Sequence, residues 1–169
     1  MKPKLWIALI TLALALVRPD GFAFAPDNGS TRQTLRGLDG VRVVVAPLKW
    51  VIEKNGLTLD QLQKDTELKL RLAGIRVVSS EESAVMPGKP LLYVNAKVLK
   101  YGSLDRYIFN IKLELSQGVS LVRSPGVETS ATTWSTSVTG TSHKLSTIRD
   151  QVKELVDTFI NAYLSVNQE

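Results

Sequence analysis

The sequence predicts one α+β domain, a two-layer sandwich in which a four- or five-stranded mixed sheet carries two helices on one face. Residues 107–115 alternate between apolar and polar side chains, which gives a β-strand one dry face and one wet face. Two segments, 58–73 and 145–166, repeat apolar residues at helical spacing. A chain of 169 residues holds one domain of this size. The expected element order is β-α-β-β-β-β-α.

The first 25 residues have the pattern of a secretory signal peptide. Lys2 and Lys4 precede an apolar run from Leu5 to Val17, which is short for a membrane span. Small residues predict cleavage after Ala23 or after Ala25. We therefore expect a periplasmic or extracellular protein, with retention of the leader as a membrane anchor as the alternative. No second apolar run of this kind follows, so no stable membrane span is expected once the leader is removed.

The composition excludes several classes of site. The chain contains no cysteine, which excludes disulfides, zinc ribbons, iron–sulfur clusters and thiol catalysis. The leader contributes +2 of the net charge of +5, so the rest of the chain carries +3. The basic residues are scattered along the chain and are not gathered with aromatic residues into a stripe. We therefore expect no nucleic-acid partner.

The first part of the expected mature chain joins the leader to the domain. Residues 26–38 are rich in Pro, Gly, Asn, Ser and Thr, which predicts a flexible lead-in. The α+β domain then covers residues 39–169. Residues 41–46 are nearly all apolar, as in a strand buried on both faces. Trp50 lies in the loop 48–56, where a tryptophan is expected to plug the end of the core, with ligand binding as the alternative.

The first long helix is expected over residues 58–73. Thr58 can cap its start, and Gln61, three residues further on, completes a capping box. Gly74 supplies the left-handed residue that ends it. Residues 75–79 follow as a short strand, and the order strand, helix, strand predicts parallel pairing.

Two leucines of this helix point away from its apolar stripe. At 100° per residue, Leu68 and Leu72 lie nearly opposite the stripe that faces the core. They are either covered by the loop 79–90 or exposed as a contact patch. An exposed patch would favour a protein-interaction domain.

The second half of the chain is expected to form three strands and the closing helix. Residues 91–100 alternate like residues 107–121, and a bend or a bulge is expected at Gly118. Residues 128–139 are rich in Thr and Ser, with Thr132, Trp134, Thr136 and Val138 on one parity, which predicts a strand near an edge of the sheet. The helix over 145–166 can be capped by Thr147.

The sequence offers no residue set for catalysis. His143 is the single histidine, which makes a transition-metal site improbable in a chain without cysteine. No nucleophile elbow, phosphate-binding loop or dinucleotide-binding motif occurs. We therefore expect a protein that is not an enzyme and that uses no cofactor or metal.

The wet face of the sheet is the better candidate for a functional surface. Tyrosine beside residues of mixed charge suits a protein contact, and the alternative is an ordinary solvated sheet face. Together with the two leucines, the candidate partner-binding residues are Leu68, Leu72, Tyr93, Asn95, Lys97 and Lys112. Ile108, Asn110 and Glu114 are expected on the same sheet face.

Two stretches resemble known exported proteins. Residues 62–78, ending in Leu72-Ala73-Gly74-Ile75-Arg76-Val77-Val78, and residues 148–157 resemble a family of bacterial exported proteins without an assigned activity. The layout of residues 39–165 is similar to the amino-terminal module of the TolB translocation protein, which the curli-secretion lipoprotein and the activator lipoproteins of penicillin-binding proteins share. The chain differs from these proteins in lacking a lipobox cysteine and the TolB propeller.

The resemblance implies an envelope adaptor domain that contacts another cell-envelope protein. The expected function is therefore a secreted or periplasmic protein-interaction domain. The alternative is a small-ligand-binding protein or a hydrolase, which a pocket with converging polar groups would favour.

Overall fold

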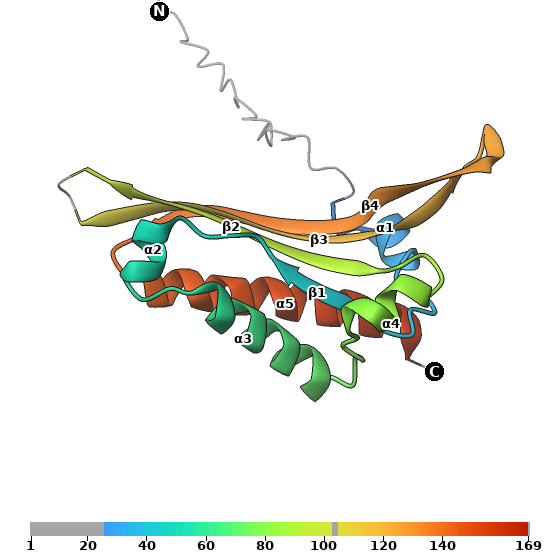
Figure 1. The fold of residues 1–169 in the computed structure, drawn as a ribbon, viewed down its shortest axis with the longest axis horizontal. Coiled ribbons are helices and arrows are strands. Elements are labelled where there is room, and N and C mark those ends of the chain that lie inside the picture. The colour runs from blue at the N-terminus through green and yellow to red at the C-terminus, as the bar shows by residue number, and fades with distance from the viewer. Residues whose placement is uncertain (1–25, 103–104, 169) are drawn as a thin grey trace, which may run out of the picture.

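The computed structural model describes residues 26–102 and 105–168, so the predicted signal peptide and its cleavage site lie outside the described residues. The sheet has four strands in the spatial order β1-β2-β3-β4 (Figure 1). They are β1 (Arg42–Val45), β2 (Leu91–Tyr101), β3 (Arg106–Leu121) and β4 (Ser124–Ser142). The pair β1–β2 is parallel and the other two pairs are antiparallel, so the sheet is mixed.

Two long helices cover one face of this sheet (Figure 1). They are α3 (Leu59–Leu72) and α5 (Leu145–Asn167), and their packing on the sheet confirms the predicted α+β sandwich. Three shorter helices complete the described chain: α1 (Gly29–Gln33), α2 (Trp50–Lys54) and α4 (Ser80–Val85). None of the described helices is long and apolar enough to cross a bilayer.

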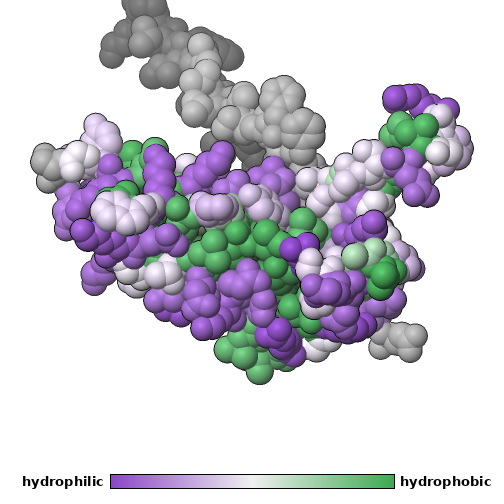
Figure 2. All heavy atoms as spheres, viewed as in Figure 1, coloured by the Kyte–Doolittle hydropathy of each residue, from purple (hydrophilic) through white to green (hydrophobic). Residues whose placement is uncertain are grey.

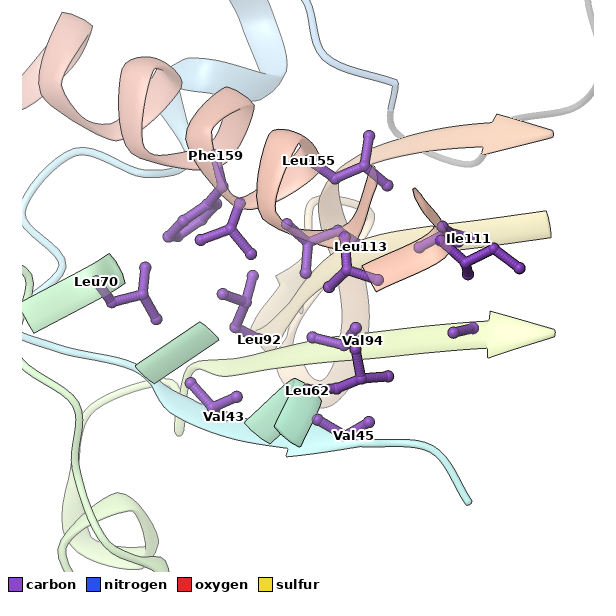
Figure 3. Close-up of a cluster of buried hydrophobic side chains, with 14 of the residues drawn as sticks. Val43, Val45, Leu62, Leu70, Leu92, Val94, Ile111, Leu113, Leu155 and Phe159 are labelled. Carbon is purple, nitrogen blue, oxygen red and sulfur yellow. The ribbon is translucent and has the colours of Figure 1, made fainter. Parts of the chain in front are cut away.

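The core lies between the sheet and the two long helices (Figure 3). It forms because alternate residues of each strand point toward the helices. The side chains labelled in Figure 3 meet from both layers, and the strands supply Val43, Val45, Leu92, Val94, Ile111 and Leu113. The helices supply Leu62, Leu70, Leu155 and Phe159.

The ends of α3 match the sequence prediction. The Thr58 hydroxyl accepts a hydrogen bond from the backbone N–H of Gln61, and the Gln61 side chain accepts one from the backbone N–H of Thr58. Gly74 has a φ of 78°, which only glycine adopts without strain. By contrast, Thr147 does not cap α5, which begins earlier, after Lys144, without a side-chain cap.

Residues 75–79 do not form the predicted strand. The segment makes one isolated parallel bridge, between Val41 and Val77. The Val41 N–H donates to the carbonyl of Arg76, and the Val78 N–H donates to the carbonyl of Val41. The pairing stops there because Ser79, the next residue, caps α4. The sheet therefore has four strands, and β1 takes β2 as its parallel partner.

Residues 26–38 are folded against the domain, although their composition predicts a flexible lead-in. Asn28 caps α1, and Leu35 is fully buried. The Asn167 amide donates to the carbonyl of Leu35 and accepts from the N–H of Gly37, at 2.9 and 2.8 Å. These contacts join the start of the described chain to the end of α5.

A partly buried ion pair within the same segment is joined to β4 by a tryptophan. Arg32 donates two hydrogen bonds to the carboxylate of Asp27, both at 2.7 Å. The indole N–H of Trp134 donates to the same carboxylate at 2.9 Å. The hydrogen bond from Arg32 is the main cause that holds the pKa of Asp27 below its usual value.

β3 and β4 continue past the helices as a two-stranded ribbon (Figure 1). The long strand was predicted, and its pairing with β4 shifts register between Leu115 and Ser116. The shift places Thr132 opposite Ser116, so its hydroxyl donates to Glu114 on the uncovered face. The prediction that Thr132 shares a face with Trp134 is therefore wrong, because a bulge reverses the alternation.

Three ion pairs join α3 to α5, and the two shortest are Arg149–Asp65 and Lys69–Asp157. Arg149 donates to both oxygens of Asp65, at 2.6 and 2.9 Å, and Lys69 lies 2.7 Å from Asp157. The hydrogen bond from Arg149 is the main cause that lowers the pKa of Asp65 from its usual value. Two parallel hydrogen bonds between a guanidinium and a carboxylate are among the stronger surface contacts.

We expect Asp27 and Asp65, whose pKa values are lowered in the folded protein, to make the domain acid-sensitive. A carboxyl whose folded pKa is lowered contributes stability above its unfolded pKa of about 3.9, and this stability is lost as pH falls through the folded pKa. Asp65→Asn should lower the unfolding free energy by about 1 kcal/mol at pH 7 and reduce its decrease between pH 5 and about 3. Urea titrations at several pH values measure both effects.

The control is Asp60→Asn, since the Asp60 carboxylate pairs with Lys64 in an exposed position. This variant should differ from the unmodified chain by less than about 0.5 kcal/mol at pH 7. If Asp65→Asn kept the full acid sensitivity, the assignment of that sensitivity to Asp65 would be wrong.

Candidate functional site

Four of the six predicted partner-binding residues come together on the uncovered face of the sheet. In the pairing of β2 with β3, Asn95 lies opposite Lys112. Tyr93 and Lys97 flank Asn95 at the next positions on the same side of β2. The sheet register therefore gathers Tyr93, Asn95, Lys97 and Lys112 into one surface, which we call the sheet-face cluster.

The charges beside this cluster are paired within the sheet. Lys112 Nζ lies 2.8 Å from Glu114 Oε1. The Asn110 amide donates to the Thr139 hydroxyl at 2.8 Å. These contacts form between residues of one layer and pair Lys112 and Asn110 within the sheet.

The other two predicted residues lie on the opposite layer, far from the sheet-face cluster. Leu68 and Leu72 are four residues apart on α3, and their exposed fractions are 56% and 78%. Figure 2 shows a hydrophobic patch at the end of α3 that lies away from the sheet. The interpretation that the loop 79–90 covers these leucines is therefore wrong, and the interpretation of an exposed patch is confirmed.

Polar contacts surround the two leucines. Beside Leu72, a shallow depression of about 260 Å³ is lined by Lys69, Leu72, Ala73, Asp157 and Ile160. The ion pair between Lys69 and Asp157 forms one side of it. Arg71 and Glu67 form a second ion pair along α3, at 2.8 Å. An apolar centre with a charged rim is the usual anatomy of a protein interface.

A hollow at the base of the ribbon does not gather reactive groups. It has a volume of about 330 Å³ and is lined by Gly88, Lys89, Gly118, Glu128, Thr129 and Ser130. Its two charged residues, Lys89 and Glu128, are exposed. Within residues 26–102 and 105–168, no group of three or more His, Asp or Glu side chains is placed to hold a metal ion.

The single histidine lies at the end of β4, on the surface. His143 Nε2 is 3.2 Å from a guanidinium nitrogen of Arg106, and its Nδ1 is 3.3 Å from the backbone carbonyl of Asp105. Neither neighbour is a nucleophile or a metal ligand, so the arrangement ties the start of β3 to the end of β4.

One exposed aromatic residue was missed by the sequence analysis. Trp50 was expected to plug the core, yet its exposed fraction is 72%. Residues 50–54 form a short helix that points Ile52 inward instead, and the Lys54 ammonium lies 5.0 Å from the Trp50 ring centroid. The exposure of Trp50 could have been predicted from its spacing to Ile52, because residues two apart on a helix point in different directions.

No protein-family model matches the chain, and the search of curated proteins gave no match.

Proposed function

We propose that the protein is a non-enzymatic interaction domain that is exported to the cell envelope and contacts another envelope protein there. The observation that carries this proposal is the exposure of Leu68 and Leu72 on α3. A soluble domain does not gain stability from large apolar side chains that remain in water, whereas a partner that covers them gains the burial energy.

Three features support α3 as the contact surface. The leucines are one helical turn apart, so a partner can cover both with one apolar segment. The helix carrying them is held rigidly by the ion pairs to α5, which lowers the entropy cost of binding. The ion pairs around the leucines supply a polar rim.

The sheet-face cluster is a weaker candidate for the same role. Lys112 is already paired with Glu114, and the cluster has one aromatic residue, Tyr93. A lysine that is already paired within its own sheet contributes little to binding a partner. A partner that contacts α3 leaves this face uncovered, since it lies on the opposite side of the sheet.

The test is cross-linking in intact cells that express the full chain, followed by mass spectrometry of the captured proteins. We expect one dominant envelope protein, and we expect Leu68→Asp/Leu72→Asp to abolish its capture. Because both side chains are exposed, the double substitution should change the unfolding free energy by about 1 kcal/mol or less. A thermal melt of the purified variant checks that it folds.

Val85→Asp is the matched control. Val85 lies on α4 with an exposed fraction of 85%, so the substitution adds a charge to another exposed apolar residue. It should leave the capture unchanged. If no partner is recovered reproducibly, or if the α3 variant captures the same protein equally well, the proposal is wrong, and a thermal-shift screen of small ligands becomes the next experiment.

A further inference from the structure

The two edge strands of the sheet, β1 and β4, differ in how far neighbouring groups cover their backbones. At the β1 edge, the strand has four residues, and the segment after α3 bridges to Val41. The Gln63 amide donates to the carbonyl of Val43 at 3.1 Å, which covers the backbone further along. A short strand covered by neighbouring groups is one way in which proteins prevent edge pairing.

The β4 edge has few of these protections. The strand is 19 residues long, and from residue 129 to residue 142 it contains no charged residue and no proline. Pro26 forms one isolated parallel bridge to Ser135 on this edge. No other described segment pairs with the edge between Thr136 and Ser142. A long uncharged edge of this kind presents backbone N–H and C=O groups to a further strand.

We propose that this edge pairs with the same edge of a second copy of the chain, antiparallel and centred on Thr139. The proposed contact joins two four-stranded sheets into one continuous sheet. It is distinct from the α3 surface and does not depend on the proposed function.

The bridge to Pro26 shows which backbone groups of β4 face outward, and Thr139 is the middle one of those beyond it. It lies on the outer side of β4, so the backbone groups of Ser135 point outward. The pairing of β3 with residues 135–142 is regular, and the outward direction therefore recurs at every second residue. A two-fold axis at Thr139 then places Thr139 opposite Thr139 of the copy, and Ser137 opposite Thr141.

The side chains suit a copy of the same segment. Ser137, Thr139 and Thr141 are exposed on the uncovered face, and Thr–Thr and Thr–Ser pairs across strands are favourable. Since the segment is uncharged, two copies meet without like-charge repulsion. On the other face, Val138 would lie opposite Gly140 of the copy, which has no side chain to obstruct it.

The first test uses opposite charges at the centre of the pairing. We would purify the full chain with Thr139→Lys, the full chain with Thr139→Glu, and the unmodified chain, and measure their masses by light scattering after size exclusion. The unmodified chain should be a dimer, and each variant alone should be a monomer. An equimolar mixture of the two variants should recover the dimer, because Lys then faces Glu.

The second test introduces single cysteines. Because the unmodified chain has no cysteine, a disulfide-linked dimer can form only through the introduced residues. In cells treated with the thiol oxidant diamide, Thr139→Cys should give a disulfide-linked dimer, since the facing Cα atoms of paired strands lie about 5.5 Å apart. Ser137→Cys alone should give no disulfide-linked dimer, whereas its co-expression with Thr141→Cys should give one. Val122→Cys, at an exposed position in the β3–β4 turn, is the negative control.

These results overturn the proposal if the unmodified chain is a monomer and Thr139→Cys links no more than Val122→Cys. A dimer that persists in both charge variants and links through other positions also overturns it, because the contact then lies elsewhere. The α3 variant Leu68→Asp/Leu72→Asp should still dimerise, so failure of the α3 proposal is recognised separately.

Discussion

Phe159→Asp should abolish the cooperative fold. Phe159 is fully buried, and its ring contacts the ring of Trp134 edge-on, with centroids 5.2 Å apart. Losing the ring costs about 3–5 kcal/mol, and burying an unpaired carboxylate adds several more. The sum is comparable with the whole stability of an ordinary domain, about 5–15 kcal/mol. The purified variant should show no cooperative transition in a thermal melt followed by near-ultraviolet circular dichroism.

Asn161→Asp is the matched control, because it adds the same carboxylate to an exposed position two residues further along α5. It should melt within a few degrees of the unmodified chain. A cooperative, near-normal melt of Phe159→Asp would contradict the packing of α5 on the sheet.

Trp134→Ala should cost about 3–5 kcal/mol of unfolding free energy, the largest loss that we expect from a single truncation on β4. The side chain is fully buried and contributes in two ways. Its ring packs on Phe159, and its indole N–H donates to Asp27, which fixes the segment before α1. Urea unfolding at pH 7 measures the loss.

Trp134→Phe separates the two contributions. It keeps an aromatic ring against Phe159 and removes the hydrogen bond, while Arg32 still satisfies the Asp27 carboxylate. We expect a loss of about 1–2 kcal/mol for this variant, from the hydrogen bond and the smaller ring. If Trp134→Ala cost less than about 1 kcal/mol, the β4 end of the core would be less tightly packed than its burial indicates.

The sheet and the long helices could be predicted because their signals are local. The alternation of residues 107–115 fixes which side chains face the core, and the capping box of Thr58 and Gln61 fixes where α3 begins. Both signals arise from backbone geometry within a few residues. The strand expected at 75–79 failed because its length depends on where the chain turns toward α4, which the apolar pattern does not encode.

The segment 26–38, by contrast, is held mainly by contacts with residues far away in the chain. Its small and polar residues are typical of a linker, and its stability comes from distant partners such as Asn167 and Trp134. Asn28 and Thr31 form a capping box that could have been recognised locally. The burial of Leu35 could not, because this part of the segment is held by residues far away in the chain, such as Thr133 and Asn167.

The sequence predicts which residues belong to the candidate site, but not how all of them are arranged in space. The alternation of β2 and β3 correctly gathers Tyr93, Asn95, Lys97 and Lys112. The helical period correctly turns Leu68 and Leu72 away from the core, and the sequence left open whether a loop covers them. Whether the leucines are covered depends on the path of the chain after α3, and tertiary contacts determine this path.

The hydrogen bonds between Asn167 and the segment after α1 also determine the order in which the chain can fold. They join residues 130 and 132 positions apart, so they close the largest loops among the described hydrogen bonds. Residues 26–38 begin the described domain, and the α5 surface on which they dock lies at its end. The first part of the domain therefore waits longest for its native contacts, and the domain stays incompletely folded until its last helix is in place.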